Sequence, residues 1–593
     1  MTTQKKIIVR RYGLREPIDW SEDCDQQLFL MNKLWNCLVE IERHHGQAYF
    51  DLMKEDKEVA DLSEKIELLI KEKAQILADR NILRRKHKIR KSPCTVPLDE
   101  RLRKISEDLR ALSITAKEKR AVVRKLFRPK LDELSRQRLV AVKEARRNSG
   151  LWWSNYNEIC RSYEHARRKA WRNGGKLHFR TFDGSGRFAN QIQGGAPMAK
   201  LFDGSHTQVK IRPLPMEAYS HPSRGHRRRL QRTELSICVY TGVDESGKRF
   251  RRTLTFPMTM HRPLPDDALI KEVIVRRYRQ GTRFYWSVSF TAIYTGTVVN
   301  GHKSHRVCGI DLGWRKVEKG LRVATIVASD DKVRHVVLPK VILQKLDYVD
   351  ALKGKIDRAA NELHTWLHQQ RYQLGALPED IAPYVNSLPM PGHASQRALL
   401  RLVLRWRDAC PDFAKDIYER LEQWRKQDKR WRNEMDNLRA KVLARRADFY
   451  RNEANQIARE FAIIGMEELD LRRFAQRSTD GEEKNQSFAE ARLNRERAAL
   501  SELRTWIEFQ AGKHAAEIVS CNGESTRQCH LCGYINTPDK RNWKNIIWRC
   551  SECDIEWDQD VNAGYNLRNW AMGSFSVMEE QTEFLDKEVT TSA

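Results

Sequence analysis

Apolar residues recur every three or four positions from Trp20 to about Asn148, which predicts long helices. Residues 92–97 contain two prolines and interrupt the pattern, so the two halves are expected to form an antiparallel helical hairpin. The basic run 84–91 falls near its tip. Such a hairpin is either an arm or dimerisation element, or a surface that contacts nucleic acid. The two apolar stripes are Val59, Leu62, Ile66, Leu69, Ile76 and Leu83, then Leu98, Leu102, Ile105, Leu109 and Leu112.

Alternation of apolar and polar residues replaces this pattern between residues 205 and 295 and predicts β-strands joined by short turns. Residues 6–12 form one more predicted strand. Several short strands of this kind favour a small barrel. The alternating segments are 234–241, 249–256, 272–278 and 283–294.

A third pattern begins at Val307, where an apolar strand ends in Asp311 and a glycine turn. Mixed strands and helices then predict an α/β region with a helical insertion. The predicted elements are strands over 321–329 and 333–338, helices over 341–460 with a break near 377–393, a strand over 461–466, helices over 486–520, and a final helix opened by 558–567.

Charge narrows the choice of partner. The chain has 593 residues, with 108 Lys+Arg against 79 Asp+Glu and a net charge of +29. Residues 141–260 hold 23 basic against 9 acidic side chains, so about half of the excess lies in a fifth of the chain. A compact fold carries such an excess most easily beside an anionic partner, and nucleic acid is the natural one. The alternative is a basic protein with a solvated surface.

Targeting signals are not apparent in the sequence. No run approaches 18 apolar residues, and the first eleven residues lack the apolar stretch of a secretory signal. The length predicts several domains.

Four of the 12 cysteines form a metal-binding pattern: Cys529-x-x-Cys532, then 17 residues, then Cys550-x-x-Cys553. Two such pairs place four thiolates around one tetrahedral Zn²⁺, and a closed four-thiolate site is structural. The alternatives are coincidence or a redox pair. Neither Cys521 nor His530 is expected to be a ligand.

Aromatic, basic and glycine residues mingle between 151 and 200. Rings such as Trp152 and Tyr163 can stack on bases, and guanidinium groups can hold phosphates. A glycine-rich turn with aromatic core residues is the alternative. The candidate nucleic-acid-binding residues of this region and of the following loop are Lys176, Arg180, Arg187, Arg227, Arg228 and Arg229.

Three acids end apolar strands or begin a helix: Asp311, Glu467 and Asp560. Taken singly, each acid is explained about as well by an ordinary turn residue as by a functional carboxylate. Together they suggest carboxylates that converge at one end of a sheet, where two Mg²⁺ ions would bind and promote hydrolysis of a phosphodiester.

The order IDLG, EELDL, CxxC…CxxC and DQDVNAGYNL resembles the split RuvC nuclease domain of the type V CRISPR effectors, which the transposon-encoded TnpB proteins share. The block HFRTFDGSGRFANQIQ and the chain length are most similar to the compact subtype V-M. The resemblance assigns the three acids as catalytic, and places Arg445 and Arg446 in the basic helix before the second motif. In the V-M branch one acid is often altered and DNA is bound with little or no cleavage; here all three acids are present.

The resemblance implies a multidomain α/β and α protein. Its parts are an RNase H-like (RuvC) nuclease domain split in sequence, a helical recognition lobe, a β-barrel wedge domain and a zinc ribbon. The expected divisions are 1–19 (wedge strand), 20–150 (helical recognition lobe), 151–304 (wedge β-barrel and guide-RNA-binding region), 305–345 (RuvC-I), 346–445 (helical insertion), 446–520 (RuvC-II), 521–556 (zinc ribbon, target nucleic-acid binding), 557–572 (RuvC-III) and 573–593 (acidic disordered tail).

The resemblance also implies a function: a CRISPR RNA-guided DNA-binding effector that recognises a flanking motif and forms an R-loop, with an Mg²⁺-dependent DNA endonuclease centre. Its partners would be a guide RNA (crRNA) and target double-stranded DNA, without a membrane, in a prokaryotic cytoplasm. A monomeric ribonucleoprotein is expected, and a dimer stays open. The alternatives are an effector that binds DNA without cutting it, a transposon-associated RNA-guided nuclease, and a structural zinc-containing RNA-binding protein.

Overall fold

The computed structural model divides the chain into two compact units. The N-terminal unit comprises Thr3–Arg279 and Arg283–Gly296, and the C-terminal unit comprises most of the chain from Thr297 onward. The structure describes residues 3–86, 96–173, 175–213, 231–243, 246–260, 264–297, 302, 304–371, 374–388, 395–468, 486–521, 524–537 and 546–573.

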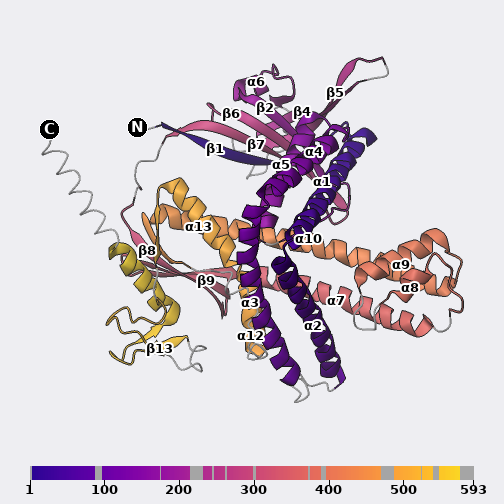
Figure 1. Ribbon diagram of the computed structural model, residues 1–593. Coiled ribbons are helices and arrows are strands. Elements are labelled where there is room, and N and C mark those ends of the chain that lie inside the picture. The colour runs from indigo at the N-terminus through magenta and orange to yellow at the C-terminus, as the bar shows by residue number, and fades with distance from the viewer. Residues whose placement is uncertain are drawn as a thin grey trace. The chain divides into compact units, whose positions relative to one another are not determined.

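The N-terminal unit combines a helical part with one large sheet (Figure 1). Its helices are α1 (Glu22–Lys54), α2 (Lys57–Lys86), α3 (Val96–Leu126), α4 (Arg128–Arg147), α5 (Trp153–Asn173) and α6 (Met198–Phe202). Its strands are β1 (Thr3–Leu14), β2 (Gly186–Pro197), β3 (Val209–Pro213), β4 (Gln231–Val243), β5 (Arg249–Met260), β6 (Leu269–Gln280) and β7 (Arg283–Thr297).

Helices α2 and α3 form the antiparallel hairpin that the spacing predicts. Cross-helix ion pairs join Arg101 to Glu72 near the middle and Arg80 to Asp99 toward the tip. The helix α3 begins at Val96, inside the segment predicted to be the break, because Pro97 sits in the first turn, where a helix needs no amide donor. The side chains of the basic run 84–91 lie outside the described residues.

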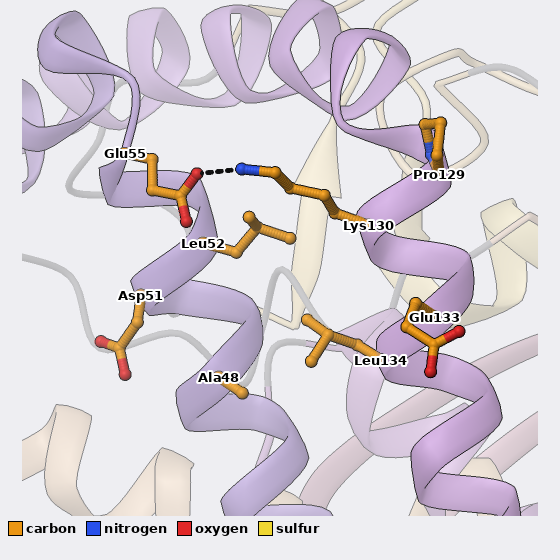
Figure 2. A pocket seen from close by; sticks show the side chains of 8 residues that line it. All are labelled: Ala48, Asp51, Leu52, Glu55, Pro129, Lys130, Glu133 and Leu134. Atoms are coloured by element: carbon orange, nitrogen blue, oxygen red, sulfur yellow. Dashed lines mark hydrogen bonds and ion pairs between the residues drawn. The ribbon is translucent and has the colours of Figure 1, made fainter.

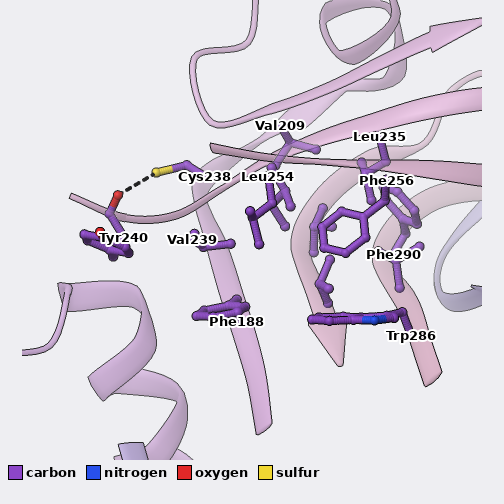
Figure 3. Close-up of a cluster of buried hydrophobic side chains, with 14 of the residues drawn as sticks. Phe188, Val209, Leu235, Cys238, Val239, Tyr240, Leu254, Phe256, Trp286 and Phe290 are labelled. Atoms are coloured by element: carbon purple, nitrogen blue, oxygen red, sulfur yellow. Dashed lines mark hydrogen bonds between the residues drawn. The ribbon is translucent and has the colours of Figure 1, made fainter. Parts of the chain in front are cut away.

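The seven strands have the order β2-β6-β7-β1-β5-β4-β3. The sheet curls so that β2 lies near β4, and two buried asparagines bridge them in place of a strand ladder. Asn155 donates to the carbonyl of Val239 at 2.7 Å and accepts from the amide of Ala189, while Asn190 donates to the carbonyl of Cys238 at 2.6 Å. The result is a barrel-like sheet around a core that includes Phe188, Phe256, Trp286 and Phe290 (Figure 3).

The C-terminal unit is built on a five-stranded sheet of order β10-β9-β8-β11-β12. Strands β8, β9 and β10 are antiparallel neighbours, and β11 runs parallel to both β8 and β12. Its strands are β8 (Val307–Val317), β9 (Gly320–Ala328), β10 (Val333–Pro339), β11 (Ile463–Glu467) and β12 (Glu517–Cys521), and a separate hairpin is formed by β13 (Ile547–Arg549) and β14 (Glu556–Asp558). Its helices are α7 (Lys340–Gln370), α8 (Ala382–Asn386), α9 (Gln396–Ala409), α10 (Lys415–Glu460), α12 (Gln486–Ala498), α13 (Leu500–His514) and a last helix over residues 559–573.

Two differences from the sequence expectations concern this unit. Residues 517–521 form strand β12 rather than the end of a helix, because the short segment EIVSC pairs in parallel with β11. The expected division between 520 and 521 therefore falls inside a strand. Likewise α10 runs unbroken through the expected division at 445, since Leu421 packs in the core of the insertion and Tyr450 in the core of the sheet. In Figure 1, α8 and α9 lie at the end of the pair α7 and α10.

Candidate metal centres

Two of the three predicted acids lie on neighbouring strands. Glu467 ends β11, but Asp311 lies inside β8, which pairs with β9 as far as Val317, so the prediction that a strand ends at Asp311 is wrong. In the parallel ladder of β8 and β11, Ile310 pairs with Met466, so Asp311 and Glu467 each follow the last paired position. Parallel strands bring such positions to the same edge of the sheet. Both acids are partly buried.

The third acid, Asp560, lies on the last helix, and two glycines of the sheet allow this helix to pack close to the other acids. Gly309 and Gly465 are paired across the ladder, each two residues before an acid. A Cβ at Gly309 would lie 2.1 Å from the carbonyl oxygen of Gly564, and one at Gly465 would lie 2.3 Å from that of Leu567. Only glycine at these positions lets the last helix lie directly on the sheet. Asp560, in the first turn of that helix, is thereby brought beside Asp311.

Electrostatics show that the three carboxylates interact. Burial raises the pKa of Asp311 well above its ordinary value, and the carboxylates of Asp560 and Glu467 raise it further, against a lowering by Arg315 and Arg322. Burial also raises the pKa of Glu467. Carboxylates placed this way repel one another unless a cation lies between them, so Asp311 and Glu467 fit a hard divalent cation such as Mg²⁺.

Asp560, in contrast, already has cationic partners. Arg315 on β8 donates to its Oδ1 at 3.0 Å, and Arg322 on β9 reaches its Oδ2 at 2.5 Å. Arg322 also forms an ion pair with Asp558, whose carboxylate caps the last helix by accepting from the amide of Asp560. The residues therefore do not offer three free carboxylates to a pair of cations.

These arginines were not among the sequence-predicted site residues. Arg322 is the one charged residue in the buried strand GLRVATIVA, and it is 6% exposed. A charge in a buried strand requires a partner, so this signal was present in the sequence. The position of Arg315 could not be predicted in this way, because it depends on a β-bulge after Leu312 that has no recognisable sequence pattern.

The four predicted zinc ligands come together. The Sγ atoms of Cys529, Cys532, Cys550 and Cys553 all lie within 4.8 Å of one another. Four thiolates at this separation fit one tetrahedral Zn²⁺, so a structural zinc site is the chemistry that the donor set favours.

The two halves of this cluster are equivalent turns. Cys529 donates its amide to the carbonyl of Tyr534 at 2.8 Å, and Cys550 donates to that of Ile555 at 2.9 Å. A residue with positive φ completes each turn, Gly533 at 75° and Asp554 at 60°. Burial opposes ionisation of Cys550, but hydrogen bonds from backbone amides and from Asn536 outweigh it and lower the pKa of this thiol to about 6.

Cys521 and His530 lie outside the cluster, as the spacing indicates. Cys521 is buried at the end of β12, where its thiol faces the carbonyl of Leu567. The ring of His530 stacks on Tyr565 with centroids 4.6 Å apart, and its Nδ1 lies 2.9 Å from Asn562.

The predicted nucleic-acid-binding residues separate into three groups. Lys176, Arg180 and Arg445 are exposed, and the guanidinium of Arg180 lies over the ring of Trp35. Arg187 is paired with Glu158, and Arg446 with Glu502. Arg227, Arg228 and Arg229 lie outside the described residues.

The aromatic residues near 150–170 are partly structural. Trp152 and Tyr163 are buried in the core of the N-terminal unit, so the prediction that their faces stack on bases is wrong. Apolar contact with α1 and the barrel outweighs any surface role there. Trp171 is exposed, but its ring N–H donates to Glu42.

A pocket of about 690 Å³ lies between α1 and α4 (Figure 2). Its lining contains Asp51, Glu55 and Glu133, with Lys130 paired to Glu55 at 2.6 Å. An acidic lining disfavours a phosphate backbone, and none of the predicted site residues contributes to it. Among the described residues, no helix is long and apolar enough to cross a membrane.

Known proteins resemble this chain over most of its length. A family model described as "Cas12f1-like, TNB domain" matches residues 501–567. The CRISPR-associated DNA-binding protein Cas12m of Pelobacter propionicus is 39% identical over 94% of this chain and 87% of that protein. A protein of the same name from Thermanaerosceptrum fracticalcis is 31% identical over 74% of this chain and 72% of its own length. The chain belongs to the Cas12m family.

This membership confirms the resemblance to the compact type V effectors of subtype V-M. Among solved structures, the Cas12f1-sgRNA-target DNA complex covers 95% of this chain at 12% identity, with a TM-score of 0.39.

Proposed function

We propose that this protein is a guide-RNA-directed DNA-binding effector of a CRISPR system, which recognises a short flanking motif and forms an R-loop. The observation that carries this function is the 39% identity, over 94% of the chain, with a protein named for CRISPR association and DNA binding. The net charge of +29 supports it, because an RNA–DNA heteroduplex is held mainly through its phosphates. The CRISPR-associated names favour this reading over a transposon-associated nuclease.

The experiment is a gel-shift titration of purified protein loaded with guide RNA. Matched duplex DNA is expected to shift, whereas a duplex with mismatches beside the flanking motif, or protein without guide, is expected not to shift. Equal binding of matched and unrelated duplexes would contradict guide direction.

The C-terminal unit supports an RuvC-type assignment. Its strand order, with three antiparallel strands followed by two parallel ones, is that of RNase H-like domains, and Asp311 and Glu467 directly follow the last paired residues of the parallel ladder. Bound Mg²⁺ would supply Lewis-acid stabilisation of a phosphodiester. Within the chain, Asp311 and Glu467 would hold the cation, and the glycine contacts would hold the last helix against them. The zinc ribbon would keep a target-binding surface folded.

A second candidate is an effector that binds DNA without cutting it. The ion pairs of Asp560 with Arg315 and Arg322 favour it, because they occupy one of the three acids. A cleavage assay with guide, Mg²⁺ and matched duplex separates the two. Cutting by wild type that is lost in Asp311→Ala and Glu467→Ala, with binding retained, supports the nuclease; tight binding with intact DNA supports the second candidate. Equal cutting by all three proteins would show that the assignment of the centre is wrong.

A further inference from the structure

Both carboxylate oxygens of Asp560 are occupied by guanidinium groups. Arg315 holds Oδ1 and Arg322 holds Oδ2, at 3.0 Å and 2.5 Å. A divalent cation bound to either oxygen of Asp560 would lie close to at least one guanidinium group and be repelled by its positive charge. The pairing therefore works against metal binding at this acid.

The two arginines are fixed in place by the strands that carry them. A β-bulge after Leu312 changes the register of β8 and sets Arg315 directly opposite Arg322 on β9. Like charges at directly opposed positions repel each other, so this pair is stable only with carboxylates between them. Asp558 and Asp560 supply those carboxylates. The two acids thus offset the repulsion between the arginines, and the arginines in turn fix the positions of the two carboxylates.

The two arginines differ in how deeply their side chains are buried. The side chain of Arg322 is 8% exposed and that of Asp560 is 13% exposed, so neither charge is well screened by solvent. The side chain of Arg315 is 23% exposed. Arg315 is therefore the partner of Asp560 that can be removed with least disturbance of the core.

The other two acids differ from Asp560. Among the residues that the structure describes, neither the Asp311 nor the Glu467 carboxylate forms an ion pair, whereas Asp560 forms two. The centre contains the carboxylates of Asp311, Glu467, Asp558 and Asp560 and the guanidinium groups that pair with two of them, those of Arg315 and Arg322. The four negative charges exceed the two positive charges by an amount that a single divalent cation neutralises. Charge balance therefore matches one cation rather than two.

We propose that Arg315 and Arg322 keep Asp560 out of metal coordination, so that this centre binds one divalent cation, at Asp311 and Glu467. The inference rests on the proposed assignment of these acids as an RuvC-type centre. Arg315 and Arg322 are then positioning residues that set metal occupancy. A centre with one cation lacks the second charge that a two-metal nuclease places on the phosphodiester.

The test is a titration of zinc-loaded, full-length protein with Mn²⁺, followed by electron paramagnetic resonance, without guide or DNA. Wild type is expected to bind one Mn²⁺, and Asp311→Asn none. Arg315→Ala is expected to bind a second Mn²⁺ at least roughly tenfold more tightly than wild type does. Two ions held about 3.5–4 Å apart would broaden each other's signal, which reports that they share the centre.

Lys316→Ala is the matched control. Lys316 neighbours Arg315 in sequence and carries the same charge, but it pairs with Glu490 and is exposed. This variant is expected to bind one Mn²⁺ with wild-type affinity. Arg315→Gln, which keeps most of the side-chain volume, repeats the test if Arg315→Ala does not fold.

Three results would overturn the inference: two Mn²⁺ in wild type, none in wild type, or unchanged number and affinity in both Arg315 variants. Because the titration contains no nucleic acid, its outcome is independent of the gel shift that tests guide-directed binding. If the gel shift contradicts guide-directed binding, the Mn²⁺ titration can still be interpreted, and the reverse also holds.

Discussion

The side-chain amide of Asn562 donates to the backbone carbonyl of Gln528 at 2.7 Å, joining the last helix to the residue before the first zinc-cluster cysteine. Asn566, one turn later, donates to the same carbonyl at 2.7 Å. Both asparagines are buried, so water cannot replace these bonds. The helix that begins beside Asp560 is therefore held by the segment that leads into the zinc cluster.

Removal of zinc is expected to loosen this helix as well as the cluster. Without the metal the two turns lose the bonds that hold their fold, and the carbonyl of Gln528 loses its fixed position. Hydrogen exchange before and after chelation should show faster exchange over residues 559–573, while the amides of α4 in the N-terminal unit keep their rates. Faster exchange confined to the cysteine turns would contradict the coupling.

Asn562→Ala is expected to lower the free energy of unfolding of the C-terminal unit by about 1–3 kcal/mol, because it leaves buried backbone groups without partners. Those groups include the carbonyl of Thr526 and the amide of His530, while the carbonyl of Ser525 keeps its bond from Asn566. Urea denaturation measures the change, and Asn569→Ala, an exposed position on the same helix, serves as the control. Equal midpoints for the two variants would show that the asparagine bonds contribute little.

Neutralising two of the candidate acids is expected to have different effects on stability. Asp560→Asn weakens ion pairs to Arg315 and to buried Arg322, and is expected to cost about 1–3 kcal/mol. Asp311→Asn removes a carboxylate whose raised pKa shows that its charge is unfavourable in the fold, so stability is expected to stay the same or increase. Urea denaturation without added divalent cations compares them. A loss of stability in Asp311→Asn equal to that in Asp560→Asn would contradict the distinction.

The sequence predicted the parts of this centre that local patterns encode. Asp311 and Glu467 follow apolar runs that pair in parallel as neighbouring strands, which brings the two acids to the end of the ladder they share. The continuation of β8 from Asp311 to Val317 was not predicted. The cysteine spacing likewise encodes the zinc cluster. Long-range contacts were not predictable in this way. The opposition of Arg315 and Arg322 depends on a bulge, and the partners of Asn562 lie more than thirty residues away in sequence.

Asn155 is expected to contribute to closure of the barrel-like sheet. Its side chain is 1% exposed and bridges the amide of Ala189 to the carbonyl of Val239. Asn155→Ala would leave both groups buried and unpaired, at a cost of about 1–3 kcal/mol. Thermal and urea denaturation measure the loss, with Asn157→Ala, a partly exposed position on the same helix, as the control. Similar stabilities would show that the bonds of Asn155 contribute little to closure of the sheet.

The exposed Lys176 and the paired Arg187 are expected to respond differently to substitution. If Lys176 contacts a phosphate of the guide RNA, Lys176→Ala weakens RNA binding and reduces the slope of log affinity against log salt by about 0.7–0.9. Its stability should not change, since the side chain is exposed. Arg187→Ala instead removes a partner of Glu158, whose side chain is 4% exposed, so a loss of stability is expected.

Filter binding between 50 and 200 mM salt measures both affinity and slope. Lys332→Ala, which removes an exposed lysine of the C-terminal unit, provides the control for a general loss of charge. A slope that falls equally in Lys176→Ala and Lys332→Ala would indicate diffuse attraction to a basic protein. A slope that falls only in Lys176→Ala places RNA against the segment that follows α5, because a single phosphate contact contributes only where it is made.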